Sequence, residues 1–175
     1  MYNNSSEVKE LFLKCCRIDG DNYNAEPEIP LKICGSYGFD GAHKIDVALL
    51  KGGNCIPVEI KLGLSGMSEG QFNRRFISGC KISHNNTRIA GSMISILDRK
   101  LPENCASEKI FAIHGEKMIH VSEKWILVAR KDVLRRWESN NQPVLSENCH
   151  VISFEEIVDT FGGEVPFNRL VNEII

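Results

Sequence analysis

The sequence predicts a single α/β (α+β) domain built on a central mixed β-sheet that is flanked by helices. Three observations lead to this prediction: a helical spacing of apolar residues opens the chain, a run of strand-like segments follows, and strands and helices then alternate. The length of 175 residues suits one hydrophobic core, and no linker divides residues 1–175. We therefore expect one domain, with its motif-bearing core at residues 5–80 and further strands and helices at residues 108–175.

The first expected element is an amphipathic helix from about residue 5 to residue 16. Ser5 or Ser6 can cap this helix. Its apolar stripe recurs at helical spacing and consists of Val8, Leu11, Phe12 and Cys15. Residues 19–30 are polar and contain prolines, which predicts a loop, and residues 31–37 predict a short strand.

A β-hairpin is the clearest local prediction, with strands at residues 44–50 and 55–62. Gly52 and Gly53 between them tolerate the positive φ that a type I′ turn needs. If these two glycines are the loop residues, the numbers of facing residues sum to 105 throughout the hairpin. One face then carries only aliphatic side chains, namely Ile45, Val47, Leu49, Ile56, Val58 and Ile60.

The rest of the chain predicts an alternation of helices and strands. The expected helices are at about 68–80, 89–97, 132–137, 154–161 and 167–175, and the expected strands are at about 109–114, 118–121, 124–130 and 150–153.

The hairpin register brings two acidic side chains together. Asp46 faces Glu59, and Lys61 projects to the same side as Glu59 because side chains alternate along a strand. Two like charges placed opposite each other are destabilising. A divalent cation would compensate them, and Mg²⁺ typically uses one or two protein carboxylates together with water and substrate phosphate. The simpler alternative is a salt bridge from Lys61 to either acid on a solvated face.

This arrangement suits metal-assisted hydrolysis of a phosphodiester bond. Asp46 and Glu59 would bind the metal, and Lys61 would orient or activate the attacking water and offset charge on the phosphate. A structure should then place the two carboxylates together beside an open, basic cleft. Asp40 is a weaker alternative to Asp46, because the turn at Gly41 separates it from the hairpin register.

Asp46 in KIDVALL and the sequence Glu59-Ile60-Lys61 in CIPVEIKLG resemble the PD-(D/E)xK nuclease superfamily, which includes restriction endonucleases. The order of elements over residues 5–80 is also similar to that family's core. The resemblance implies a restriction-endonuclease-like core with a β-meander, Mg²⁺ or Mn²⁺ as cofactor, and a nuclease activity. An endonuclease that acts on DNA is the leading expectation, and RNA stays open as the alternative substrate.

The resemblance also implies further metal ligands. The backbone carbonyl of Ile60 would be a third ligand, and many relatives add a glutamate from the first helix. Glu7 borders the apolar stripe of that helix, whereas Glu10 points away from it, so Glu7 is the better candidate. A solvated helix acid is the alternative for both.

The charge distribution predicts a nucleic-acid-binding face. Residues 61–100 carry seven basic and two acidic side chains, whereas residues 138–175 carry one basic and seven acidic side chains. Gln71, Arg74 and Arg75 on the helix after the hairpin are the candidates for phosphate contact. Chance scatter of charge and an ordinary polar helix face are the alternatives.

Composition bounds the location and the partners. The chain has seven cysteines without C-x-x-C spacing, its histidines show no zinc spacing, and it opens on MYNNSSEVKE without a secretion signal. We therefore expect reduced thiols in a cytoplasmic protein, without a zinc site or a membrane span. A homodimer fits an enzyme that cuts both strands of a duplex. Two other functions stay open: a catalytically silent member of the same fold that binds nucleic acid or protein, and an unrelated α/β protein.

Overall fold

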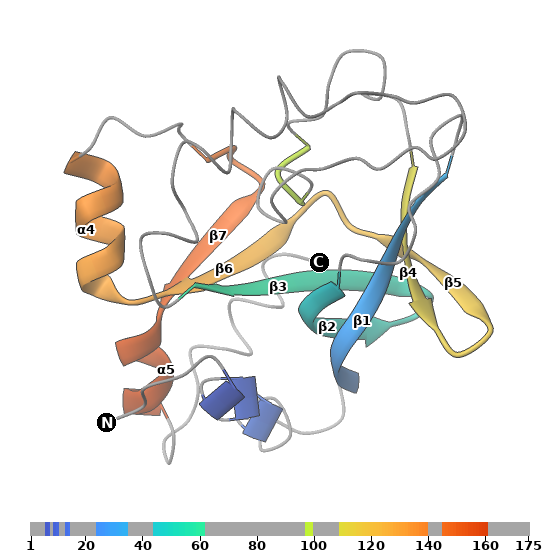
Figure 1. The fold of residues 1–175 in the computed structure, drawn as a ribbon, viewed down its shortest axis with the longest axis horizontal. Coiled ribbons are helices and arrows are strands. Elements are labelled where there is room, and N and C mark those ends of the chain that lie inside the picture. The colour runs from blue at the N-terminus through green and yellow to red at the C-terminus, as the bar shows by residue number, and fades with distance from the viewer. Residues whose placement is uncertain are drawn as a thin grey trace.

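The computed structural model describes residues 6–7, 9–10, 13–14, 24–34, 44–61, 97–99, 109–139 and 145–160. Seven strands form one sheet, and two helices follow strands of its second half (Figure 1). The strands are β1 (Asn24–Cys34), β2 (Lys44–Lys51), β3 (Asn54–Lys61), β4 (Lys109–His114), β5 (Lys117–Val121), β6 (Trp125–Ala129) and β7 (Cys149–Ser153). The helices are α4 (Lys131–Ser139) and α5 (Phe154–Thr160).

The sheet is mixed, as the sequence predicts, and part of it closes on itself. Its order is β2-β1-β4-β5-β3-β6-β7, and β2 also pairs with β3, so that the first five strands form a ring. Strands β6 and β7 extend the sheet from β3 and run parallel to it. In Figure 1, α4 and α5 lie at the β6–β7 side of the molecule. The fold is therefore a sheet-rich α+β fold, whereas the restriction-endonuclease-like core stays a prediction.

The hairpin register is confirmed where β2 and β3 pair. The facing residues run from Lys51↔Asn54 to Val47↔Val58, and each pair sums to 105 as expected. Gly52 and Gly53 have φ of 56° and 81°, the positive values that the tight turn requires. The turn sequence therefore sets which side chains of the two strands meet.

Replacing Gly53 by alanine should destabilise the protein by about 1–2 kcal/mol, because a residue with a Cβ is strained at a left-handed φ. A Cβ at this position would meet no atom within 4 Å, so backbone strain is the sole expected cost. Urea unfolding measures the change. The exposed turn residue Glu116 provides a control, since Glu116→Ala should change stability by less than about 0.5 kcal/mol. Equal stability of the two variants would contradict the prediction.

The first strand is the main correction to the sequence-based elements. Residues 19–30 were expected as a loop, but β1 begins at Asn24 and pairs with β2 along Asn24–Pro30 and with β4 along Leu31–Cys34. Pro27 faces Val47, and an antiparallel ladder places no hydrogen bond between the two strands at that pair. The polar residues of this segment thus predicted a loop, but its pairing with two distant strands makes it a strand.

The later elements agree with the prediction to within a few residues. Strands β4 to β7 and helices α4 and α5 lie where strands and helices were expected. The helices expected at 68–80 and 167–175, and nearly all of the one at 89–97, lie outside the described residues. None of the described helices is long and apolar enough to cross a membrane. The cytoplasmic location and the homodimer stay predictions.

The core consists of two clusters of buried apolar side chains. The first lies among β1 to β6 and α4 and contains the fully buried Trp125. The second lies among β2, β3, β6, β7 and α5, and Leu13 of the N-terminal helical residues joins it. Val47 and Leu49 belong to the second cluster as the alternation predicts, but Ile45 belongs to the first. The prediction that Ile45 lies on the aliphatic face is therefore wrong. The alternation of side chains between the two faces of β2 is interrupted at the residue between Ile45 and Val47.

Candidate functional site

Asp46 is the residue at this break, and it lies at a gap in the ladders on both sides of β2. The β2–β3 ladder ends at Val47↔Val58, one pair before Asp46 and Glu59. On the other side, the β1–β2 pairs skip from Pro27↔Val47 to Ile29↔Ile45. Glu28 is therefore opposite Asp46 without a ladder pair, and its φ of 55° is unusual for a residue other than glycine.

The Asp46 carboxylate fills part of the gap towards β3. Its Oδ2 accepts a hydrogen bond of 2.8 Å from the Ile60 N–H. In a continued ladder this N–H would donate to the backbone carbonyl of Ile45. The N–H and C=O of one strand residue point to the same side, so the Ile60 carbonyl also faces β2. The gap thus gathers the Asp46 carboxylate and the backbone of Ile60.

Glu59 is buried, and its two carboxylate oxygens have different surroundings. The residue is 3% exposed, although carboxylates are rarely buried. Oε1 lies 2.7 Å from the Lys61 Nζ, as expected for side chains two residues apart on one strand. Oε2 is buried and has no hydrogen-bond partner among the residues that the structure describes. An orphaned carboxylate oxygen in the interior is costly and marks a place where a further group could bind.

Burial raises the pKa of Glu59 to about 7, from an ordinary value of 4.5. The positive charge of Lys61 opposes this rise, whereas the negative charge of Asp46 adds to it. Asp46 and Glu59 are therefore close enough to influence each other. At neutral pH the Glu59 carboxyl is poised between its protonated and ionised forms.

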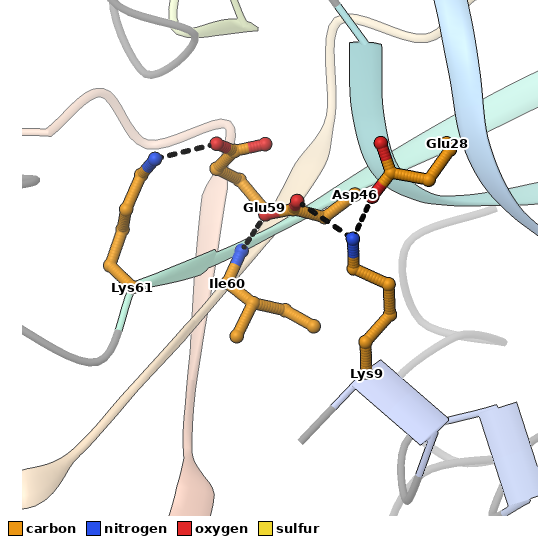
Figure 2. A network of polar contacts seen from close by, with 6 residues as sticks. All are labelled: Lys9, Glu28, Asp46, Glu59, Ile60 and Lys61. Atoms are coloured by element: carbon orange, nitrogen blue, oxygen red, sulfur yellow. Dashed lines mark hydrogen bonds and ion pairs between the residues drawn. The ribbon is translucent and has the colours of Figure 1, made fainter. Parts of the chain in front are cut away.

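A second lysine, which the sequence did not suggest, reaches Asp46 from the N-terminal helical residues. The Lys9 Nζ lies 3.3 Å from the Asp46 Oδ1 and also pairs with the Glu28 carboxylate. In Figure 2, the Asp46 carboxylate lies between the pair of Glu59 with Lys61 and the pair of Lys9 with Glu28. Lys9 and Glu28 therefore join Asp46, Glu59 and Lys61 in one cluster of charged side chains.

Their absence from the prediction has a physical explanation. Glu28 lies in the segment that was expected as a loop, so no strand register could be assigned to it from the sequence. Lys9 lies one helical turn before the buried Leu13, on the same face. Leu13 was not part of the expected apolar stripe, and recognising it would have turned Lys9 towards the sheet.

The structure brings together Asp46, Glu59, Lys61 and the Ile60 backbone. Glu7 and Glu10 are exposed, and the role of Glu7 as a ligand stays a prediction. Four other candidates lie outside the described residues, namely Asp40, Gln71, Arg74 and Arg75.

The expected repulsion between the acids is compensated in the structure by lysines. Lys61 pairs with Glu59, which was the simpler alternative, but Glu59 is buried rather than on a solvated face. Within the described ranges, no three His, Cys, Asp or Glu side chains are grouped so as to hold a metal. A Mg²⁺ site needs only one or two carboxylates with other oxygen ligands. Asp46, Glu59 and the Ile60 carbonyl are the oxygen donors that could contribute to such a site, and binding of Mg²⁺ there stays a prediction.

Two hollows in the described surface lie at the other end of the same hairpin. Their volumes are about 650 Å³ and 500 Å³, and both are lined by Lys51 and Gly52 at the turn. Other basic side chains in their lining are His114, Lys117, His120 and Lys124, together with the acidic Glu123. The turn is about 17 Å along the strand from Asp46. The basic surface of these hollows is thus separated from the carboxylates by the length of the hairpin.

No family model, curated protein or solved structure matches the chain. The functional interpretation therefore depends on the geometry of the site.

Proposed function

We propose that the protein is a metal-dependent nuclease, most simply a DNA endonuclease, whose active site is the gap between β2 and β3. The observation that carries the proposal is Glu59. It is buried beside Asp46, one of its oxygens holds Lys61, and the other has no partner among the described residues. A buried carboxylate with a raised pKa next to a second acid and a lysine is characteristic of functional sites.

Asp46, Glu59 and the Ile60 carbonyl would hold Mg²⁺ or Mn²⁺. The ion, when bound, would supply Lewis-acid polarisation of the phosphate and a lowered pKa for bound water. Lys61 is held by Glu59 at 2.7 Å and has donors left for a phosphate oxygen or the attacking water. In the hydrolysis, the water oxygen forms a bond to phosphorus, the phosphorus bond to the leaving sugar oxygen breaks, and that oxygen takes up a proton.

The basic hollows at the hairpin turn support nucleic acid as the substrate. Lysine and histidine side chains there suit contacts with backbone phosphates, which dominate nucleic-acid affinity. The separation of about 17 Å from Asp46 corresponds to about five base pairs of duplex. A duplex lying along the hairpin could therefore contact both ends.

A catalytically silent binding protein of the same class is the second candidate. Lys9 and Lys61 supply positive charge to the two acids, so the cluster is compensated without a metal. This candidate keeps the nucleic-acid surface and lacks hydrolysis.

Plasmid nicking tests the proposal. With Mg²⁺ or Mn²⁺ the intact chain should nick supercoiled DNA, and EDTA should abolish the activity. Asp46→Asn keeps the side-chain size but removes the charge, and it should reduce the rate at least about 100-fold, because metal ligands contribute several kcal/mol to such reactions. The exposed Glu116 gives a matched control, so Glu116→Gln should cleave as the unmodified protein does.

Two outcomes would overturn the nuclease proposal. One is cleavage that survives both EDTA and Asp46→Asn. The other is DNA binding without cleavage in either metal, which would favour the silent binding protein.

A further inference from the structure

We infer that the outward face of the β4–β5 hairpin binds an unpaired strand of DNA, with the bases on its apolar and aromatic side chains and the phosphates on lysines at its rim. The inference rests on the proposed function for the choice of DNA, and it narrows the substrate to DNA with an unpaired stretch. In Figure 1, this hairpin lies on the opposite side of the molecule from α4 and α5. His120 of β5 is in register with Asn54 beside the β2–β3 turn, so the surface lies away from the carboxylates.

Alternation along β4 and β5 turns one row of side chains outward. Ala112 and Val121 are fully buried in the first core cluster, so the residues that alternate with them face away from that core. The outward row consists of two facing pairs, Phe111 with His120 and Ile113 with Met118. Met118 is 46% exposed, and Phe111 and Ile113 are half-buried. Exposed apolar side chains that are grouped rather than scattered mark an interaction surface.

The aromatic pair of this row suits contact with nucleic-acid bases. The rings of Phe111 and His120 meet edge to face, with centroids 6.1 Å apart and an interplanar angle of 87°. The His120 side chain is exposed. Bases of single strands stack on phenylalanine and histidine rings, and this stacking tolerates every base. Paired bases are already stacked on one another within a duplex, so the surface favours a strand whose bases are unpaired.

Lysines surround the row. His120 lines the hollow of about 650 Å³, and Met118 lines the hollow of about 500 Å³. The linings of the two hollows together contain three lysines, namely Lys51, Lys117 and Lys124. An apolar row between lysines matches a single strand, because bases and phosphates alternate with short spacing along such a strand.

The acids near the row do not cancel this positive charge. Glu123 is the acid in the linings, and it lies close to Arg99. Burial lowers the pKa of Arg99, whereas the negative charge of Glu123 opposes that change. The Arg99 guanidinium is held there by hydrogen bonds of 2.9 Å and 3.3 Å to the carbonyl oxygens of Val121 and Ser122. Glu116 of the β4–β5 turn lines neither hollow, so the rim complements a phosphate backbone.

DNA binding in the absence of metal tests the inference on the intact chain. A labelled oligodeoxythymidine of about 20 nucleotides is titrated in EDTA, and fluorescence anisotropy gives its affinity. Met118→Glu places a negative charge within the row and should weaken binding at least about tenfold, because this charge repels the phosphates. Val151→Glu is the matched control, since Val151 is 44% exposed and lies on β7. It should change the affinity less than about twofold.

Stacking and phosphate contact are separated by two further variants. His120→Ala should weaken binding of the oligonucleotide at least about fivefold and leave binding of a duplex of the same length unchanged. Combining Lys117→Gln with Lys124→Gln should lower the slope of log affinity against log salt concentration by about 1.4, because each phosphate contact with a single strand contributes about 0.7. Lys14→Gln, a change at an exposed lysine near the N-terminus, should leave the slope unchanged.

The outcomes distinguish this inference from the nuclease proposal. The inference is overturned if Met118→Glu binds the oligonucleotide as tightly as Val151→Glu, or if His120→Ala loses as much affinity for the duplex as for the single strand. Absence of oligonucleotide binding by the unmodified chain overturns it as well. The nuclease proposal fails on its own if the affinities follow the expected order and no DNA is cut with Mg²⁺ or Mn²⁺. Cleavage that requires Asp46 but is unchanged in Met118→Glu and His120→Ala overturns only the inference.

Discussion

Asp98→Ala is expected to destabilise the protein by about 3 kcal/mol or more, because one buried and two half-buried donors would lose their acceptor at once. Asp98 is 5% exposed. It accepts hydrogen bonds from the Trp125 indole N–H at 3.0 Å and from the Ser146 N–H at 2.9 Å and hydroxyl at 2.5 Å. Each donor left unsatisfied in the interior costs about 1–3 kcal/mol. This one side chain thus connects residues 97–99 to the start of β6 and to the segment before β7.

Urea unfolding of Asp98→Ala, Asp98→Asn and a surface control measures the effect. Asp98→Asn keeps one acceptor oxygen and should lose about half as much free energy of unfolding as the alanine variant. Asp132 is the control, because it is partly exposed and forms an ion pair with Arg130 at 3.0 Å. Asp132→Ala should cost less than about 1 kcal/mol. A loss for Asp98→Ala no greater than that of the control would show that the network does not hold these segments together.

The hairpin shows which parts of the fold were predictable from the sequence. Its register depends on the two turn glycines and on alternation along the strands, and both are local properties. Strand β1 depends instead on edges supplied by β2 and β4. The prolines and acids of β1 form a polar local pattern that is typical of a loop. A local pattern cannot indicate which distant strands will pair with a segment. The closed ring of five strands was unpredictable for the same reason.

The candidate site divides in the same way. Asp46, Glu59 and Lys61 were found because they share one hairpin. Lys9 and Glu28 come from other elements, and only tertiary packing brings them to Asp46. Two neighbouring acids need a compensating positive charge, and in the structure Lys9 and Lys61 supply it. Lys9 lies in a distant element, so its part in this compensation was not predictable from the hairpin.

Glu59→Gln is expected to stabilise the folded protein by up to about 3 kcal/mol at pH 8 while abolishing metal-dependent cleavage. The Glu59 pKa is about 7 in the folded state and 4.5 in its ordinary state. Between these pH values the folded protein holds a proton that the unfolded chain has released, so stability falls as pH rises. Above pH 7 the full penalty for a buried charge is present, about 1.4 kcal/mol for each unit of pKa change. Glutamine carries no charge and avoids this penalty.

The pH dependence distinguishes this cause from a general effect of the substitution. The stability difference between Glu59→Gln and the unmodified chain should be largest at pH 8 and vanish near pH 4, when followed by urea unfolding across that range. Glu156 gives a control of opposite sign, because hydrogen bonds from Ser153 lower its pKa. Glu156→Gln should therefore weaken the protein at neutral pH and lose its effect as pH falls.

Added metal is expected to change the stability of the protein through Glu59. A cation at the site favours the ionised carboxylate, so Mn²⁺ should stabilise the unmodified protein at pH 8 by lifting the penalty that burial imposes. The same addition should leave the stability of Glu59→Gln nearly unchanged, because its amide gives the ion no charge to bind. A protein that is less stable with its carboxylate than with the neutral amide, and that regains this stability with Mn²⁺, retains Glu59 for binding rather than for folding. Stability that is independent of pH between 4 and 8 in the unmodified chain would contradict this interpretation.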